Sequence, residues 1–448
     1  MKHVSIFTII IGLVFFASYS VYAGAETSGN LSKDLKLVIV GFIEDSNMQK
    51  AGAEIGDILI SYNNEKVHSI KHLGVLKEAV QTEEVEVFVL RKDEKIKLII
   101  PKGKMGIYIE EYAPDHKMDE NAVIIEGIGK LEWGIGMENS FLAAVYRIDE
   151  KYGNNLSYTD IIGLSGYGFR TLFFDKWCPS SPDATCGFDS GSEILKKLGY
   201  ETEYFFLKNE QFEQMGIPTK SQYEIRDIIL KSIDRGWPVI AIDLIDVPEW
   251  GIITGYQKEG KELFCRTYFD RTQRYEIAQK FPWVICVIKK KENVDILPDY
   301  QRSILLAKKL YNTEKYENYF SGIRALDEWI IALQDNEYLN SIEDEEMQEV
   351  WMANWWIYYS LFEARKIAQQ YLLDNKEKFD IEVELIDQLT ELYAKETKIM
   401  EDGFAFVPSP YNEKFSEWNE ETRAKQFEVM KTLLQVENEV NDILLKIE

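Results

Sequence analysis

Residues 247–257, VPEWGIITGYQ, are the stretch that constrains the fold most strongly. They follow one apolar run, GWPVIAIDLID, and a Lys-Glu-Gly-Lys turn then leads into another, ELFCRTYFD. Three apolar runs separated by turns predict an antiparallel β-meander. Helical segments precede this meander within residues 118–292, so the segment has the element order of an α+β domain.

Length and charge limit the function. The chain has 448 residues, of which 46% are apolar, and this is enough for several domains with sizeable cores. Asp and Glu number 76 against 51 Lys and Arg, which gives a formal net charge of -25. A surface of this charge repels phosphate backbones and anionic lipids, so we exclude nucleic-acid binding.

The first 25 residues have the pattern of an export signal. A short basic end precedes an apolar run over residues 4–23. Small residues then occupy cleavage positions, as the pair Val21 and Ala23 or the pair Ala23 and Ala25. We expect an exported protein, extracellular or at the cell surface. The run is close to the roughly 20 residues that span a bilayer, so an uncleaved membrane anchor is the alternative.

An exported chain can keep disulfide bonds. Cys178 and Cys186 lie in a polar loop, WCPSSPDATCG, and we expect them to form a bridge. Cys265 and Cys286 lie in apolar strand contexts, and we expect buried thiols or a cross-strand pair. The CxxC spacing of metal and redox sites is absent, so the sequence predicts no metal site and no cofactor.

Residues 33–104 alternate short strands and turns. Two glycines allow turn conformations that a β-carbon forbids, and an aspartate can brace the turn between them. The pattern is A-G-x-x-x-G-D-I-L, formed by Ala51, Gly52, Gly56, Asp57, Ile58 and Leu59. Together with the strand that follows, this motif resembles that of a bacterial PDZ domain, a β-sandwich-like fold. The turn Asn63-Asn64-Glu65 departs from the usual Asn-Gly.

The PDZ resemblance implies a peptide or protein partner. Such domains bind an extended peptide, often a free C-terminus, as an added strand. In this chain the strand at 37–43 and the helix at 69–80 would flank the peptide. The candidate peptide-binding residues are Leu37, Val38, Ile39, His72 and Leu73. A solvated role for His72 stays open, and the Gly-Ile-Tyr-Ile segment at Gly106 is an alternative carboxylate-binding loop in a permuted domain.

The segment 118–292 opens with a helix after GIGMENS, for which Asn139 or Ser140 is the expected N-cap. The apolar residues of this helix recur at helical spacing: Phe141, Leu142, Val145 and Ile148. IIGLSGYGFR, RGWPVI and GIITGY follow in that order. The order resembles the papain-like superfamily, most closely the N-terminal domain of the butirosin biosynthesis protein H family, with the C39 peptidases as wider kin.

In that family a cysteine at the start of the first helix attacks an acyl carbonyl, and a histidine on the meander activates it. The matching positions fall near Met137 or Glu138 and near Glu249 or Trp250, and none is a cysteine or a histidine. The resemblance therefore implies the fold without the Cys-His dyad. The whole chain has four histidines, all outside 118–292: His3, His68, His72 and His116.

Three replacements for the dyad are open. Ser140 can act with a lysine such as Lys130, or it can simply cap its helix. Cys178 can be a nucleophile, or it can be half of a disulfide. Glu138 and Glu249 can share protons as acid and base, or they can be a helix-start charge and a solvated side chain.

Residues 297–448 contain almost no glycine or proline before Gly403, which predicts an all-α helical bundle. We interpret a Trp and Tyr stripe within it as core. The stripe is Trp351, Trp355, Tyr358, Tyr359 and Phe362, and the expected helices are 298–320, 322–333, 345–373, 381–400 and 413–447. The function we expect is peptide or protein binding. The alternative is a peptidase or acyltransferase-type enzyme with a replaced nucleophile.

Overall fold

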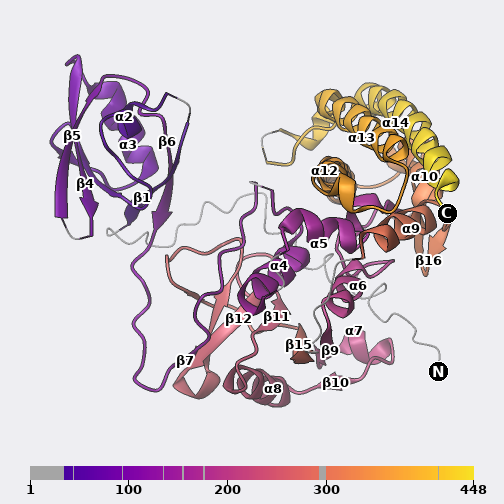
Figure 1. Cartoon of the computed structure of the whole chain (residues 1–448), viewed down its shortest axis with the longest axis horizontal. Coiled ribbons are helices and arrows are strands. Elements are labelled where there is room, and N and C mark those ends of the chain that lie inside the picture. Colours follow the sequence, from indigo (N-terminus) through magenta and orange to yellow (C-terminus); the bar gives the residue numbers. More distant parts are fainter. Residues whose placement is uncertain are drawn as a thin grey trace. The chain divides into compact units, whose positions relative to one another are not determined.

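The computed structural model describes residues 35–43, 45–92, 94–134, 136–153, 156–174, 177–291, 299–411 and 413–448. The expected signal peptide or anchor at 1–25 lies outside these residues. The described chain has antiparallel and mixed sheets followed by a helical region, which confirms a multidomain α+β protein (Figure 1). It divides into two compact units. Among the described residues, the N-terminal unit is 35–122 with Phe269–Ile277, and the main unit is Val123–Tyr268 with Ala278–Glu448.

The N-terminal unit is built on an antiparallel sheet with the strand order β5-β4-β2-β1-β6. Buried residues alternate along β4, where Val85, Val87 and Val89 face the core and their neighbours do not. Its elements are β1 (Lys36–Phe42), α2 (Asn47–Lys50), β2 (Ile58–Tyr62), β3 (Glu65–Lys66), α3 (Ile70–Ala79), β4 (Glu84–Arg91), β5 (Glu94–Pro101), β6 (Ile107–Tyr112) and β14 (Glu276–Ile277).

The glycine motif of this unit behaves as its sequence predicts. Gly52 and Gly56 have φ angles of 97° and 93°, in the region that favours glycine. The carboxylate of Asp57 accepts the amide of Glu54 at 2.9 Å and is held by Arg91 Nε at 2.7 Å. Asp57 therefore braces the turn that leads into β2.

Strand β1 lies inside the sheet, which changes where a peptide can pair. Leu37 and Val38 pair with β2 on one side, and β6 pairs along the other side of the strand. Leu37 and Ile39 are fully buried. Both hydrogen-bonding edges of β1 are occupied, so the expected addition of a peptide beside Leu37, Val38 and Ile39 has no free edge there.

The meander at residues 239–266 forms as the sequence predicts. In the main sheet the strand order is β10-β9-β15-β11-β12-β13, and β7 also pairs with β12. Most neighbours are antiparallel, and β10 is parallel to β9. The strands are β7 (Val123–Ile124), β9 (Tyr200–Leu207), β10 (Thr219–Lys220), β11 (Val239–Ile242), β12 (Trp250–Gln257), β13 (Glu262–Arg266) and β15 (Val284–Lys291).

Helices cover this sheet. Helix α4 packs against β11 and β12, α6 packs against β9, and α8 contacts six strands from the other side, namely β7, β9, β10, β11, β12 and β15 (Figure 1). The apolar spacing of α4 predicted this burial, because Phe141, Leu142, Val145 and Ile148 are all at most 1% exposed. The helices are α4 (Ser140–Tyr152), α5 (Tyr158–Leu164), the 3-10 turn η3 (Tyr167–Phe169), α6 (Ser190–Lys197), α7 (Glu210–Gln214) and α8 (Gln222–Asp234).

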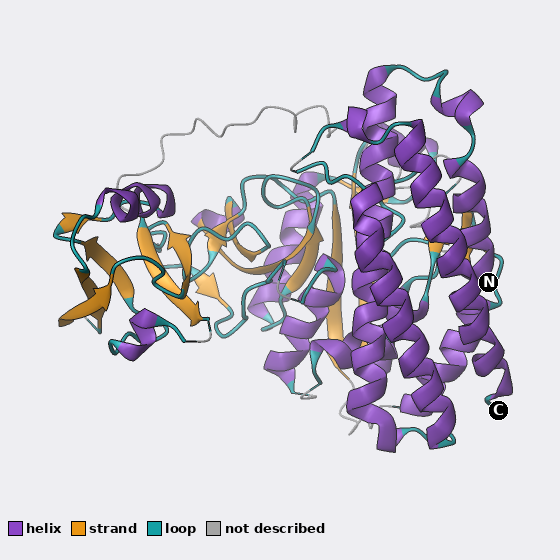
Figure 2. Cartoon of the chain, turned by 90° about the horizontal axis from the view of Figure 1, so that it is seen from above, coloured by secondary structure: helices purple, strands orange, loops and turns teal. Residues whose placement is uncertain are grey.

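The C-terminal region of the main unit is helical, with three long helices side by side in Figure 2. Three of the five predicted helical stretches form with changes of at most three residues at their ends, and the stretch predicted over 413–447 begins as a helix only at Glu420. The helices are α9 (Tyr300–Tyr311), α10 (Gly322–Leu333), α11 (Asn336–Leu339), α12 (Asp344–Asn375), α13 (Val383–Gly403) and α14 (Glu420–Lys446).

The helix predicted over 298–320 is wrong in its second half. Helix α9 ends at Tyr311, and a hairpin of β16 (Lys315–Tyr316) and β17 (Tyr319–Ser321) follows. Glu317 has a φ of 52°, which makes the tight turn between these strands. Strand β17 pairs with β8 (Leu172–Phe173). Tertiary pairing with β8 thus replaces the local helical preference.

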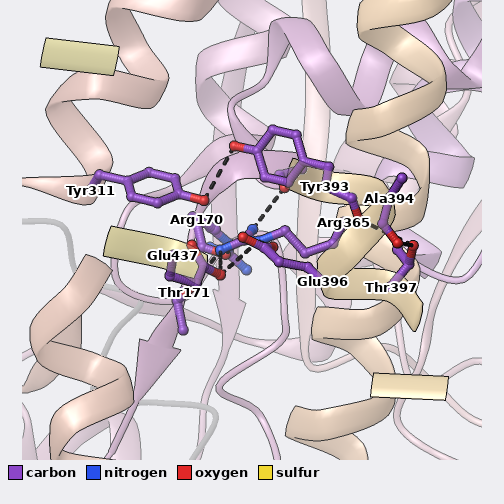
Figure 3. Close-up of polar contacts among 10 residues, drawn as sticks. Arg170, Thr171, Tyr311, Arg365, Tyr393, Ala394, Glu396, Thr397 and Glu437 are labelled. Carbon is purple, nitrogen blue, oxygen red and sulfur yellow. Dashed lines mark hydrogen bonds and ion pairs between the residues drawn. The ribbon is translucent and has the colours of Figure 1, made fainter. Parts of the chain in front are cut away.

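Arg365 joins α12 to the sheet-bearing part of the main unit (Figure 3). Its fully buried guanidinium donates to Gly168 O at 2.8 Å and to Thr171 Oγ1 at 2.7 Å. It also pairs with Glu437 Oε1 at 2.8 Å and with Glu396 Oε2 at 3.2 Å. Several fixed acceptors around one planar donor hold α12, α13 and α14 against the η3 segment.

A glycine lets α5 approach α12 closely. A β-carbon on Gly163 would lie 2.4 Å from the ring of Tyr371, so only glycine fits this contact.

Further along α12 the predicted aromatic stripe is core: Trp351, Trp355 and Tyr358 are buried, and Tyr359 and Phe362 pack against the same cluster.

Candidate active site

Three of the four predicted catalytic residues line one cavity of the main unit. The cavity has an empty volume of about 520 Å³, including its open mouth. Its walls come from the start of α4, the loop before α6, the loop before β12 and one face of α12. The lining residues are Glu138, Asn139, Ser140, Tyr167, Pro179, Ser180, Pro182, Asp183, Pro248, Glu249, Trp356 and Ser360.

Ser140 is the first residue of α4, and Asn139 is its N-cap. The side chain of Asn139 accepts the amide of Leu142 at 3.0 Å, so the capping role that the sequence left open between these two residues belongs to Asn139. The hydroxyl of Ser140 is thereby available to other partners. It donates to Glu249 Oε2 at 2.6 Å and accepts the amide of Trp250 at 3.2 Å.

Glu249 precedes β12 and faces the cavity. Burial raises its pKa to about 7, against an ordinary 4.5, and the negative charge of Asp183 adds to the rise. The hydrogen bond from Ser140 opposes the rise because it favours the ionised form. A carboxyl group with a pKa near neutrality can both take and release a proton.

The loop that precedes Glu249 has a strained backbone. Asp243 and Asp246, in the loop before β12, have φ angles of 66° and 49°, which side chains with a β-carbon seldom adopt. Lys280 braces the loop by donating to Asp243 Oδ1 at 2.9 Å and to the carbonyl of Asp246 at 2.7 Å. The loop is therefore held in one conformation at the cavity wall.

Asp183 is a site residue that sequence reasoning missed. Its carboxylate accepts Trp250 Nε1 at 2.8 Å and both the amide and hydroxyl of Thr185, at 2.7 and 2.6 Å. These donors fix the charge beside Glu249. In the sequence, the feature that could have identified Asp183 is a carboxylate in the middle of a Pro-rich loop. Only the fold, however, brings that loop to the meander.

The buried Arg170 shapes the same loop. Its guanidinium donates to the carbonyls of Pro182 at 2.9 Å, Cys186 at 2.9 Å and Phe188 at 2.8 Å, and also to that of Asp183. These bonds close the loop as a disulfide would. The bridge predicted between Cys178 and Cys186 is not formed, since both are free, buried thiols.

Cys178 does not line the cavity. It is 2% exposed, and its Sγ lies 3.8 Å from Tyr319 Oη. Burial raises the pKa of its thiol, which disfavours the nucleophilic thiolate. The structure therefore gives no support to Cys178 as the nucleophile.

Cys265 and Cys286 are also free and buried. They lie on β13 and β15, which are separated by β11 and β12. Three strand spacings amount to roughly 14 Å, well beyond the reach of a disulfide. Of the two expectations, buried thiols are confirmed and the cross-strand pair is wrong.

Glu138 has partners of its own. Its carboxylate accepts the amides of Gly134 and Gly136 at 3.1 Å. Its charge also raises the pKa of Tyr359, after the larger effect of burial. Ser140, rather than Glu138, is the hydrogen-bond partner of Glu249. Lys130 does not take the role of base either, because the hydroxyl of Ser140 donates to Glu249.

The histidine nearest in sequence to the main unit lies elsewhere. The ring of His116 pairs with the carboxylate of Glu276, and both residues belong to the N-terminal unit. The cavity therefore has no imidazole among its lining residues.

In the N-terminal unit, His72 and Leu73 occupy the first turns of α3. Leu73 is 5% exposed and packs in the core. His72 is half-buried, and its ring lies 5.4 Å from that of His68. Helix α3 contacts β6, and the amide of Ile70 donates to the carboxylate of Glu111 on that strand.

No protein-family model matches this chain, and no curated protein matches it. Within the described residues, no group of three or more His, Cys, Asp or Glu side chains is placed to hold a metal ion. In the same part of the chain, every helix is too short or too polar to cross a membrane.

Proposed function

We propose that this is an exported protein that binds an extended peptide or protein segment on its N-terminal unit, as a PDZ domain does. The observation that carries the proposal is the position of β6. This strand ends the sheet order, and β1 is its strand partner among the described residues. An end strand with a free edge is a template for an added strand.

The edge groups of β6 point in the required direction. Ile43 donates its amide to Gly106 O, so the backbone of Gly106 faces β1. Alternate residues then turn their backbone groups the other way, which directs those of Ile107, Ile109 and Glu111 to the free edge. The side chains of Ile107 and Ile109 are half-buried against the core and offer apolar contacts to a peptide.

The loop before β6 is fixed by glycine. Gly106 has a φ of 78°, and a β-carbon there would lie 2.7 Å from Ser46 Cα. This is the Gly-Ile-Tyr-Ile segment that the sequence offered as a carboxylate-binding loop. Its close packing against Ser46 fixes the start of β6, and α3 is the helix that contacts this strand.

The test is fluorescence anisotropy with a library of labelled peptides that have free carboxyl ends, each compared with its amidated form. We expect peptides with an apolar last residue to bind and amidation to weaken binding at least tenfold, about 1.4 kcal/mol. Ile107→Ala should weaken binding similarly. Ile99→Ala is the matched control, because Ile99 is 53% exposed on β5, the other end strand. Equal binding by Ile107→Ala and the parent protein would contradict the proposal.

A further inference from the structure

We propose that Ser140 is the nucleophile of an acyl-transfer site in the cavity of the main unit, with Glu249 as its general base. This activity is independent of peptide binding by the N-terminal unit. It gives a specific form to the enzyme that the sequence left as the alternative, since neither a cysteine nor a histidine takes part.

The first support is the direction of the hydrogen bonds. Ser140 Oγ donates its proton to Glu249 Oε2 at 2.6 Å, and the amide of Trp250 donates to the same Oγ at 3.2 Å. The proton that a nucleophilic hydroxyl must lose already points at the base. Both residues line the cavity.

The second support is the place of Ser140 on its helix. The side chain of Asn139 takes the amide of Leu142, and its carbonyl takes that of Ala143. The cap therefore leaves the first two amides of α4, those of Ser140 and Phe141, to other acceptors. Helix N-terminal amides and the helix dipole stabilise negative charge, such as that which develops on a carbonyl oxygen under attack.

The third support is the chain of carboxyl groups behind Ser140. Asp183 is fixed by Trp250 and Thr185, and its charge helps to keep Glu249 close to its titration point at neutral pH. A base orients the nucleophile, and a third group tunes the base. Asp183 is thus a positioning residue in this proposal.

The reaction balances without a cofactor. Ser140 Oγ attacks the carbonyl carbon of an ester or amide while its proton passes to Glu249. The tetrahedral intermediate then expels the alcohol or amine, which takes that proton from Glu249, and an acyl-serine ester remains. Water attacks this ester, giving one proton to Glu249. Ser140 Oγ leaves and takes up that proton, and the carboxylic acid departs.

The lining of the cavity indicates the substrate class. Three carboxyl groups, of Glu138, Asp183 and Glu249, face it, and none of the lining residues is a lysine or an arginine. Pro179, Pro182, Pro248 and Trp356 supply apolar walls. This surface suits an uncharged or cationic ester or amide with a small apolar acyl group, and it repels anionic acyl groups.

The competing explanation is that the Ser140–Glu249 bond only holds α4 to the start of β12. The two explanations differ in reactivity. We therefore suggest treating the purified full chain with diisopropyl fluorophosphate across pH 6 to 8.5, and mapping any adduct by mass spectrometry. Near-ultraviolet circular dichroism of each variant checks that its fold is intact.

We expect a single adduct on Ser140, forming faster as pH rises with a midpoint near 7. Ser140→Ala should give no adduct, and Glu249→Gln should label about 100-fold more slowly, within the range of general-base effects. Ser341→Ala is the control and should label like the parent, because Ser341 is exposed and is not among the residues that line the cavity. The proposal is overturned if folded parent protein gains no adduct on Ser140, or if Glu249→Gln labels as fast as the parent.

Discussion

Ser140 Oγ lies 2.6 Å from Glu249 Oε2, across 109 residues of sequence, and this contact joins the first turn of α4 to the start of β12. The resemblance to papain-like proteins, which stays a prediction, would place a cysteine near Met137 or Glu138, two or three residues before Ser140, and a histidine near Glu249 or Trp250. In this protein the side chain at the start of the helix is a serine hydroxyl, and it faces a proton acceptor on the meander. The acceptor is a carboxyl group instead of an imidazole.

Glu249 should make the stability of the protein depend on pH. Its pKa is about 7 in the folded chain against 4.5 ordinarily, so between these values the folded state holds a proton that the unfolded state has lost. Stability therefore falls as pH rises from 4.5 to 7 and then levels off. At about 1.4 kcal/mol per pKa unit, the full loss is on the order of 3 kcal/mol.

Denaturant unfolding of parent and Glu249→Gln at several pH values measures this effect. The variant should gain stability relative to the parent as pH rises to 7. Asp189 has a pKa of about 6, raised chiefly by burial, and adds a loss of the same sign to both proteins. The difference between the two curves therefore isolates Glu249, although Asp183, Glu138, Tyr167 and Tyr268 lie around the same site. Parallel curves would contradict the raised pKa.

A thiol at position 140 should report access to the cavity. The four native cysteines are buried and free, so they should react slowly with iodoacetamide in the folded protein. In Ser140→Cys the new thiol should be alkylated much faster than these four, as followed by mass spectrometry. A variant that reacts no faster than the parent would mean that the cavity is closed to small molecules.

The two ion pairs of Arg365 should contribute unequally to the free energy of unfolding. Arg365→Met leaves Glu437 buried without its cation, and such a loss typically costs on the order of 3–5 kcal/mol. Burial and the charge of Glu437 raise the pKa of Glu396 well above its ordinary value, which disfavours the charged form of Glu396 even though Arg365 opposes the rise. Glu396→Gln should therefore change the free energy of unfolding by less than about 1 kcal/mol. Similar losses for both variants would show that Glu396 carries a charge.

The thiol count of the protein tests whether the loop held by Arg170 also carries a disulfide. Because the carbonyls of the loop are held by the guanidinium, the bridge between Cys178 and Cys186 is not needed for its shape. Titration of the denatured, unreduced protein with a thiol reagent should find four thiols. Two thiols would mean that the loop carries a disulfide.

The sequence predicted what depends on local periodicity. The meander, the buried face of α4 and the aromatic core of α12 follow from apolar spacing, and Asp57 braces its turn as the glycine motif suggested. The hairpin after Tyr311 and the interior position of β1 depend on pairing with distant strands. No local pattern contains that information.

The site was predictable in parts. Ser140, Glu138 and Glu249 were identified, but the sequence paired Glu249 with Glu138 and Ser140 with a lysine, whereas Glu249 is hydrogen-bonded to Ser140. Asn139 caps the helix, and the amides of Gly134 and Gly136 bind the carboxylate of Glu138. Ser140 and Glu249 are therefore hydrogen-bonded to each other. Asp183 reaches them only through a loop that Arg170 folds.

The most direct test is a titration of Glu249 itself, followed by the carbon-13 chemical shift of its carboxyl group and assigned with Glu249→Gln. We predict an apparent pKa near 7 in the parent protein. In Ser140→Ala the value should rise further, because the hydrogen bond that favours the ionised form is gone. A pKa near the ordinary 4.5 that Ser140→Ala leaves unchanged would contradict the coupling of Ser140 and Glu249.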